Sequence, residues 1–83
     1  MKALKLAIIG AGSTYTPELI EGLIQNRADL PFRKVYLMDI DSRKLNIVGG
    51  LARRMLEAED MPVELVLTDN LEAAIQGADY VMG

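Results

Sequence analysis

A short apolar run that ends in two closely spaced glycines most constrains how this chain folds. Residues 4–9 read Leu-Lys-Leu-Ala-Ile-Ile, and a Gly-x-Gly turn from Gly10 to Gly12 follows at once. The length of the run, its β-branched end and the glycines favour a buried strand over a helix. The turn needs a backbone conformation that glycine adopts without steric cost, which Gly10 supplies. Thr16 is then expected as the N-cap of a helix, with Pro17 at its first position.

The rest of the chain continues the alternation of strands and helices. Spacing of apolar residues and the positions of Gly, Pro, Asp and Asn predict the remaining elements. They are a strand at 35–40, a helix at 43–59, a strand at 63–67, a short helix that Asn70 caps and Gly77 ends, and a strand that begins at 78–82. This order, β-α-β-α-β-α-β, predicts an α/β fold: a Rossmann-like parallel sheet with helices on both faces, truncated after about four strands.

Several local features of this fold are expected from single residues. Asp41 or Ser42 caps the long helix, and Asp41 is interpreted as a cap rather than as a ligand. The pair Gly49-Gly50 in the middle of that helix costs about 1 kcal/mol per glycine relative to alanine. Close packing of this pair against the sheet would explain its presence. Gly22 is expected to provide a second close contact between helix and strand.

The glycine turn is a candidate loop for binding a dinucleotide. Gly12 lacks a side chain where a pyrophosphate would approach, and the helix behind it offers N–H groups and the positive end of its dipole. Ser13 and Thr14 add hydroxyl donors. Tyr15 stands where the dinucleotide fingerprint has its third glycine, which indicates a helix that starts later, at Thr16.

An acidic residue near the end of the second predicted strand completes the candidate site. Asp39 lies 27 positions after Gly12, somewhat beyond the usual spacing of ~20 but within a unit that holds a full helix and loop. A carboxylate there accepts hydrogen bonds from the ribose hydroxyls of adenosine and repels a 2′-phosphate. NAD is therefore expected in preference to NADP. The candidate cofactor-binding residues are Gly10, Ala11, Gly12, Ser13, Thr14 and Asp39.

The composition argues against several other functions. The chain has no Cys and no His, so it lacks the most common metal ligands and the usual neutral-pH base, and no catalytic or metal-binding residue is assigned. Its net charge is −3 and its basic residues are dispersed, which does not suit a nucleic-acid surface. Neither a secretory leader nor an apolar run near the ~20 residues of a membrane span is evident. No membrane partner and a cytoplasmic location are expected.

A resemblance to a known family rests on longer motifs. The run at 9–19, Ile-Gly-Ala-Gly-Ser-Thr-Tyr-Thr-Pro-Glu-Leu, resembles the N-terminal signature of family 4 glycoside hydrolases, especially the 6-phospho-β-glucosidases. Further matches lie at 37–41, 47–51 and 77–81. The resemblance covers essentially all 83 residues, is more specific than Gly-x-Gly alone, and accounts for Tyr15 in place of the third glycine.

The resemblance implies an unusual hydrolysis. In that family NAD takes a hydride from C3 of a 6-phosphoglycoside, a base removes the C2 proton, the C1 group is eliminated, and water addition and hydride return follow. A divalent metal, typically manganese, polarises the sugar oxygens. The family's metal ligands, catalytic tyrosine and most substrate contacts would lie beyond Gly83. Residues 1–83 are therefore expected to be the N-terminal part of a Rossmann NAD-binding domain that is catalytically incompetent alone, with NAD held by Gly10, Gly12, Ser13, Thr14 and Asp39.

Two other interpretations remain open. A lactate- or malate-dehydrogenase-like protein shares the same start, although Tyr15 argues against it. A small non-catalytic nucleotide-binding module would suit the length, but an end at Met82-Gly83, within an apolar strand, opposes it. The sheet edge left uncovered there predicts self-association.

Overall fold

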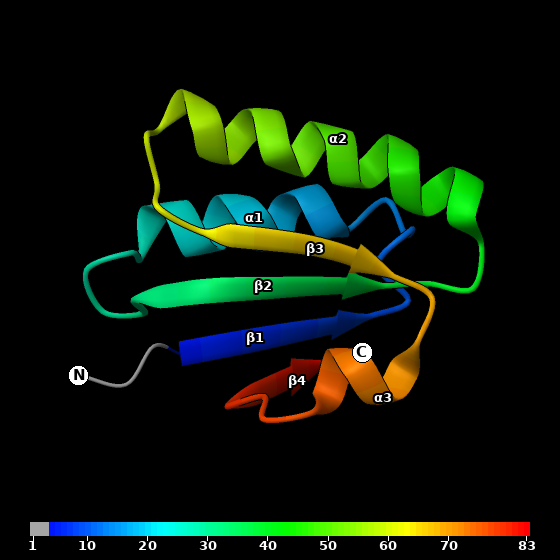
Figure 1. The fold of residues 1–83 in the computed structure, drawn as a ribbon. Coiled ribbons are helices and arrows are strands. Elements are labelled where there is room, and N and C mark those ends of the chain that lie inside the picture. Colours follow the sequence, from blue (N-terminus) through cyan, green and yellow to red (C-terminus); the bar gives the residue numbers. More distant parts are fainter. Residues whose placement is uncertain (1–3) are drawn as a thin grey trace.

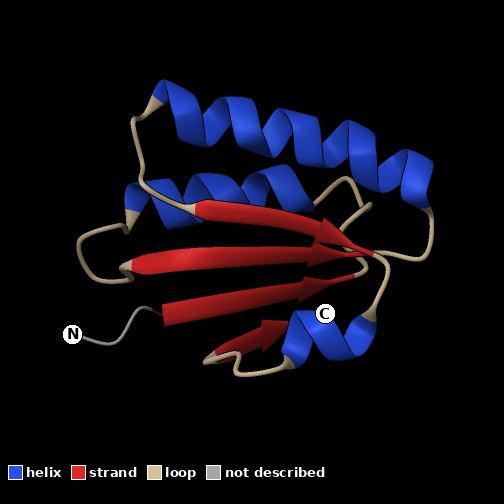
Figure 2. Cartoon of the chain, viewed as in Figure 1, coloured by secondary structure: helices blue, strands red, loops and turns tan. Residues whose placement is uncertain are grey.

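The computed structural model describes residues 4–83 and confirms the α/β class. Its elements, in chain order, are β1 (Leu4–Ile9), α1 (Thr16–Gln25), β2 (Phe32–Met38), α2 (Ser42–Ala58), β3 (Glu64–Thr68), α3 (Leu71–Ile75) and β4 (Tyr80–Met82). The four strands are parallel and lie in the order β3-β2-β1-β4. Helices α1 and α2 cover one face of the sheet and α3 covers the other (Figures 1 and 2). The predicted Rossmann-like arrangement is therefore confirmed.

Strand β1 contributes to a core on each face of the sheet. Leu6 and Ile8 belong to the larger core beneath α1 and α2, whereas Ala7 packs with Met38 and Ala74 in a smaller core beneath α3. The side chains of Leu6, Ala7 and Ile8 are 2% exposed or less. Burial on both faces explains why β1 reads as a nearly continuous apolar run, as strands of parallel sheets do.

Strand β2 starts and ends earlier than the sequence predicted. It spans Phe32–Met38 rather than 35–40, and Phe32 pairs with Leu4 at the start of β1. The earlier start places the side chain of Phe32 in the larger core, where it is removed from water. Ile40, by contrast, is 86% exposed. Asp39 therefore lies just after the strand, where its carboxylate is free to face the neighbouring loop.

The other predicted boundaries shift by one or two residues. Strand β3 is Glu64–Thr68 rather than 63–67, and β4 is Tyr80–Met82 within the predicted 78–82. Helix α2 is capped by Asp41, whose side chain accepts a hydrogen bond from the backbone N–H of Lys44. Asn70 caps α3 in the same way. Both predicted caps are confirmed, with Asp41 rather than Ser42 at the start of α2.

The two glycines in the middle of α2 have different surroundings. A Cβ added to Gly49 would lie 2.6 Å from both Cδ atoms of Leu67 on β3, so this helix packs closely on the sheet at that point. A Cβ on Gly50 would meet only the Arg54 side chain, at 3.5 Å. The expectation of close packing is right for Gly49 and wrong for Gly50. It is also wrong for Gly22, where an added Cβ would meet no described atom within 4 Å.

A buried lysine attaches α3 to the sheet. Lys5 in β1 is 8% exposed, and its Nζ donates hydrogen bonds to the carbonyl oxygens of Ala73 at 3.0 Å and Gln76 at 2.6 Å. The same Nζ lies 3.9 Å from the ring centroid of Tyr36. A cation at the C-terminal end of a helix satisfies carbonyls that have no partner within the helix. Lys5 thus holds the connection that leads from β3 to β4.

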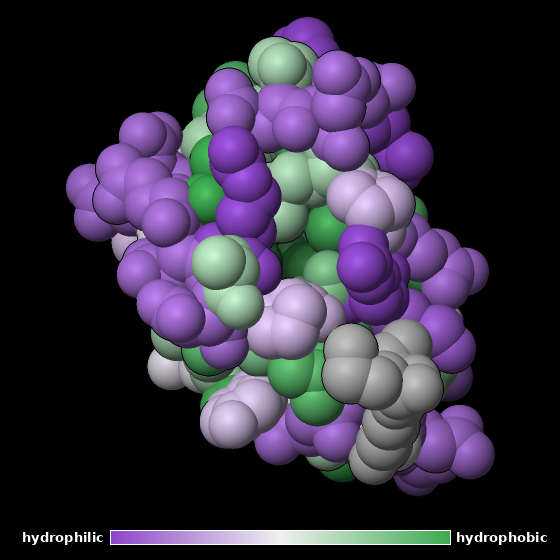
Figure 3. Space-filling model, turned by 90° about the vertical axis from the view of Figure 1, so that its left-hand side faces the viewer, coloured by the Kyte–Doolittle hydropathy of each residue, from purple (hydrophilic) through white to green (hydrophobic). Residues whose placement is uncertain are grey.

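The surface at the amino ends of the strands contains apolar atoms within a polar rim. Figure 3 views the molecule from that side and shows a hollow with hydrophobic residues in its floor and hydrophilic residues around it. None of the helices in residues 4–83 combines the length and the apolar character needed to cross a membrane. The candidate cofactor residues lie at the opposite edge, where the strands end.

Candidate functional site

The glycine loop and Asp39 lie together at the carboxyl edge of the sheet. Residues 10–15 connect β1 to α1, and Asp39 follows the neighbouring strand β2 (Figure 1). The backbone N–H of Ala11 donates to the carbonyl of Met38 at 2.9 Å, and that of Gly12 donates to Oδ2 of Asp39 at 2.8 Å. Ligands of open α/β sheets bind at this edge. The structure therefore brings the sequence-predicted residues of both segments into one place.

Asp39 is held by the backbone through both of its carboxylate oxygens. Oδ1 accepts a hydrogen bond from the N–H of Asp41 at 2.9 Å, while Oδ2 accepts from Gly12. The N–H of Asp41, then that of Gly12, lowers the pKa of Asp39 below its ordinary value, and the nearby charge of Lys44 acts in the same direction. Asp39 is consequently an anion at neutral pH with defined orientation. Each of its oxygens retains a further lone pair that can accept a hydrogen bond.

The two glycines of the turn are required for different reasons. Gly10 has a φ of +73°, which confirms the predicted turn conformation. Gly12 has no such φ, but a Cβ there would lie 2.8 Å from Oδ2 of Asp39 and 2.9 Å from Cβ of Lys44. The packing of the loop against Asp39 and α2 thus already excludes a side chain at position 12. Space for an approaching pyrophosphate is not needed to explain this glycine.

Among the described residues, the loop amide of Thr14 has no protein partner. The N–H of Ser13 donates to the carbonyl of Gly10 at 3.2 Å, and that of Tyr15 makes a long bond of 3.4 Å to Oγ of Ser13. For Thr14, neither the backbone N–H nor the hydroxyl has a hydrogen bond within residues 4–83. A donor that is exposed and unpaired at the start of a helix suits an anionic ligand.

Helix α1 begins differently from the sequence prediction. Thr16 is the first helical residue and not the N-cap, which is Tyr15 and forms no hydrogen bond from its side chain. The Thr16 side chain is fully buried, and its hydroxyl donates to the carbonyl of Ala11 at 2.7 Å. The predicted capping bond is replaced by one that closes the loop on itself. The sequence could not reveal this, because both roles use the same residue type at the same position.

A cavity beside the loop contains residues that the sequence did not single out. It has a volume of about 400 Å³ and lies between the loop residues and the first two turns of α2. Its lining residues are Gly12, Ser13, Thr14, Lys44, Ile47 and Val48. The available signal was topological: α2 starts immediately after Asp39, so its first turns must lie near whatever Asp39 contacts.

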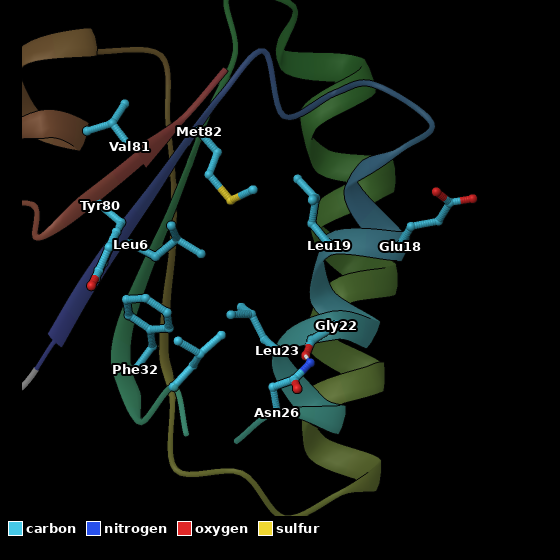
Figure 4. Close-up of a pocket in the computed structure, with 11 residues that line it drawn as sticks. Leu6, Glu18, Leu19, Gly22, Leu23, Asn26, Phe32, Tyr80, Val81 and Met82 are labelled. Atoms are coloured by element: carbon cyan, nitrogen blue, oxygen red, sulfur yellow. Dashed lines mark hydrogen bonds between the residues drawn. The ribbon is translucent and has the colours of Figure 1, made fainter. Parts of the chain in front are cut away.

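A second cavity lies away from this site and is predominantly apolar. It has a volume of about 430 Å³ and opens between α1 and the strands β1 and β4. Leu19 and Leu23 of α1 point into it toward Leu6, Phe32 and Met82 of the sheet, whereas Glu18 points away (Figure 4). None of the six candidate cofactor residues lines this cavity.

Metal-binding side chains are not gathered in the described part of the chain. Residues 4–83 contain no group of three or more His, Cys, Asp or Glu side chains placed to hold a metal ion. The candidate site is therefore a loop with one oriented carboxylate, the unpaired amide of Thr14, two hydroxyls and a nearby lysine. Such a site is suited to the phosphate and ribose groups of a nucleotide.

Comparison with known proteins identifies relatives of this chain. Residues 5–83 match the family described as Family 4 glycosyl hydrolase. A curated relative from Bacillus subtilis (strain 168), named probable 6-phospho-beta-glucosidase, is 48% identical over 82 residues, covering 96% of this chain and 19% of the relative.

Solved structures share the fold as well. A 6-phospho-alpha-glucosidase from gut microorganisms, in complex with NAD and glucose-6-phosphate, superposes with a TM-score of 0.90 at 34% identity and covers 98% of this chain and 19% of its own. A 6-phospho-beta glucosidase from Thermotoga maritima, with manganese, NAD+ and glucose-6-phosphate, gives 0.85 at 35% identity, covering 94% and 19%. The chain thus spans about a fifth of the length of these relatives.

Proposed function

This chain belongs to family 4 of the glycosyl hydrolases, and from this membership we propose that it forms the NAD-binding segment of a 6-phosphoglycosidase. The observation that carries the proposal is the contact between the glycine loop and Asp39, which joins the two predicted halves of a dinucleotide site at the carboxyl edge of the sheet. In the two related structures described above, NAD is bound.

Each residue of the proposed site has a distinct role. Gly10 makes the turn, and Gly12 lets the loop pack on Asp39. The N–H of Thr14 and the hydroxyls of Ser13 and Thr14 donate to the pyrophosphate, next to the N-terminus of α1. Asp39 accepts hydrogen bonds from the adenosine ribose through the lone pairs that its backbone partners leave free. Ala11, which is buried, holds the loop against β2 through its own N–H.

The donor set fits NAD but provides no metal ligands. NAD supplies, when bound, an acceptor for a hydride from the sugar. The residues in this chain bind and orient the cofactor, and they leave the catalytic steps to groups outside the chain. The manganese ion of the Thermotoga relative would be held in a longer family member by residues other than 4–83.

We propose the β-configured 6-phosphoglycosides as the substrate class of such a longer protein. The support is the 48% identity to the relative from Bacillus subtilis, whose name specifies the β-anomer. The chain alone is proposed to be inactive. Mixed with NAD, Mn²⁺ and 4-nitrophenyl β-glucoside 6-phosphate, it should release no nitrophenol above a blank, and release that requires NAD would contradict this.

The cofactor proposal is tested by measuring NAD affinity of the 83-residue chain and of two variants. Asp39→Ala removes the ribose acceptor and should weaken NAD binding by about tenfold or more, as expected for a lost hydrogen bond to a charged group. Asp29→Ala is the matched control, because Asp29 is exposed in the loop at the opposite edge of the sheet. Circular dichroism verifies that both variants fold. Equal affinity of the Asp39 variant and the wild type would refute the ribose assignment.

A further inference from the structure

We propose that Lys5 is a positioning residue of the cofactor site: it fixes the end of β4 beside the glycine loop, where the half of NAD beyond the pyrophosphate lies. The inference rests on the proposed function, because it takes the positions of the adenosine ribose and the pyrophosphate from there. It adds a wall of the site that none of the six candidate cofactor residues provides.

The order of the strands gives the direction in which a bound dinucleotide runs. Asp39 follows β2, the glycine loop follows β1, and β4 lies on the other side of β1. A dinucleotide that has its adenosine ribose at Asp39 and its pyrophosphate over the loop therefore continues toward β4. Ligands of open α/β sheets bind where the strand order reverses, and in this sheet that point lies between β1 and β4.

The end of β4 lies next to the start of the glycine loop. Ile8 in β1 pairs with Met82 in β4, and a Cβ added to Gly83 would lie 3.8 Å from the Cβ of Ile9. Ile9 is the residue before Gly10, where the turn begins. Strand β4 has three residues and lies at one edge of the described sheet. Its position beside the loop therefore depends on contacts in addition to its short pairing with β1.

Lys5 supplies these contacts from the other end of β1. Its backbone N–H donates to Oδ2 of Asp79 at 2.8 Å, and its carbonyl accepts a hydrogen bond from the N–H of Asp79 at 2.9 Å. Its Nζ donates to the carbonyls of Ala73 and Gln76 at the end of α3. One residue of β1 thus holds both the helix that leads into β4 and the residue that directly precedes this strand.

The ammonium group is the part of Lys5 that an apolar side chain could not replace. Lys5 is 8% exposed, and a charge buried to this extent is costly unless hydrogen bonds satisfy it. The two carbonyls and the ring face of Tyr36, 3.9 Å away, provide that compensation. Hydrogen bonds are directional, whereas apolar contacts are not. Lys5 therefore sets where β4 begins as well as contributing to stability.

The test measures the affinities of NAD and ADP for the wild type, Lys5→Met and Lys34→Met. ADP has the adenosine ribose and the two phosphates but lacks the nicotinamide riboside. Lys5→Met keeps an unbranched side chain and removes the ammonium group, so it should weaken NAD binding by about three- to tenfold and leave ADP binding unchanged. Lys34 is an exposed lysine of β2, and Lys34→Met should change neither affinity. Circular dichroism verifies that both variants fold.

The ratio of the two affinities separates positioning from a purely structural role. Equal losses for NAD and ADP in Lys5→Met would show that Lys5 stabilises the fold as a whole, and unchanged affinities would show that β4 does not depend on it. Either result would overturn the inference and leave the proposed function standing. A wild type that binds neither nucleotide would overturn the proposed function as well.

An NMR titration of the wild type keeps the inference testable even if Lys5→Met does not fold. NAD should shift the amide resonances of Met82 and Gly83, whereas ADP should not, and both nucleotides should shift the amide of Gly12. In a folded Lys5→Met variant the NAD-induced shift at Gly83 should decrease. If NAD shifts Gly12 in the wild type but leaves Met82 and Gly83 unaffected, the end of β4 is no wall of the site and the inference fails.

Discussion

The backbone N–H of Gly12 donates a 2.8 Å hydrogen bond to Oδ2 of Asp39, across 27 residues of sequence. This bond joins the loop after β1 to the end of β2, beside the bond from Ala11 to Met38. Asp39 therefore shapes the loop as well as facing the position proposed for the ribose. A substitution at Asp39 changes both the loop and the proposed ribose contact. Stability measurements on the chain without NAD separate the effect on the loop from the effect on binding.

The first prediction concerns the pH dependence of this bond. The pKa of Asp39 in the folded chain lies below its ordinary value of 3.8, chiefly because the N–H groups of Asp41 and Gly12 stabilise its anion. A depressed pKa contributes stability that is present above pH ~4 and is lost as the pH falls through the folded value. Asp39→Asn removes this contribution. In urea unfolding the variant should be less stable than the wild type at pH 7, and the difference should shrink below pH ~4. A difference that is the same at pH 7 and pH 3 would contradict the assigned cause.

The second prediction uses two glycines with opposite surroundings. Gly12→Ala would place a Cβ against Asp39 and Lys44 and should destabilise the fold by about 1–3 kcal/mol. Gly22→Ala, in α1, has space for the new methyl group and should stabilise it by about 0.5–1 kcal/mol. Chemical denaturation of both variants measures these changes. A neutral Gly12→Ala variant would show that the loop does not pack on Asp39 in solution.

The third prediction concerns adjacent glycines in α2. A Cβ at Gly49 would lie 2.6 Å from Leu67, so Gly49→Ala should destabilise the chain by about 1–3 kcal/mol. Gly50→Ala meets only the flexible end of Arg54 and should gain about 0.5–1 kcal/mol from helix propensity. Thermal unfolding of the two variants provides the comparison. Effects of equal sign would argue against the close approach of α2 to β3.

The fourth prediction concerns the uncovered edge of the sheet at β4. Tyr80 and Val81 are 56% and 54% exposed, and the side chain of Val81 points away from the apolar cavity (Figure 4). An unpaired edge that exposes apolar side chains favours pairing between molecules. The elution volume in size-exclusion chromatography should therefore decrease as concentration rises. Val81→Lys should suppress this shift, whereas Lys34→Ala should not. A wild type that is monomeric at all concentrations would refute self-association.

The sequence predicted those parts of the structure that depend on short-range patterns. The bounds of β1, the turn at Gly10 and the caps Asp41 and Asn70 are confirmed, because a glycine turn or a cap is decided within a few residues. The family motif in the first helix and loop also indicated the relatives correctly.

Features that depend on tertiary contacts were missed or assigned wrongly. Thr16 was expected to cap α1, but its side chain is buried and its hydroxyl donates to the carbonyl of Ala11 instead. Gly22 was expected to contact a strand, and only the packing of α1 shows that it does not. Lys5 was read as part of an apolar strand, although its Nζ bonds to carbonyls at the end of α3 that lie 68 and 71 residues later. Lys44 was not considered because its place beside Gly12 follows from the fold.

An amide NMR titration of this chain with NAD tests whether the loop at 10–14 and Asp39 bind the cofactor. We expect the largest shifts at Thr14, whose N–H has no partner in the described structure, and at Gly12 and Asp41, whose N–H groups bond to Asp39. Amides at the opposite edge, such as Asp29, should remain unchanged. A dispersed spectrum that NAD leaves unaffected, or shifts confined to the apolar cavity around Leu23, would contradict it.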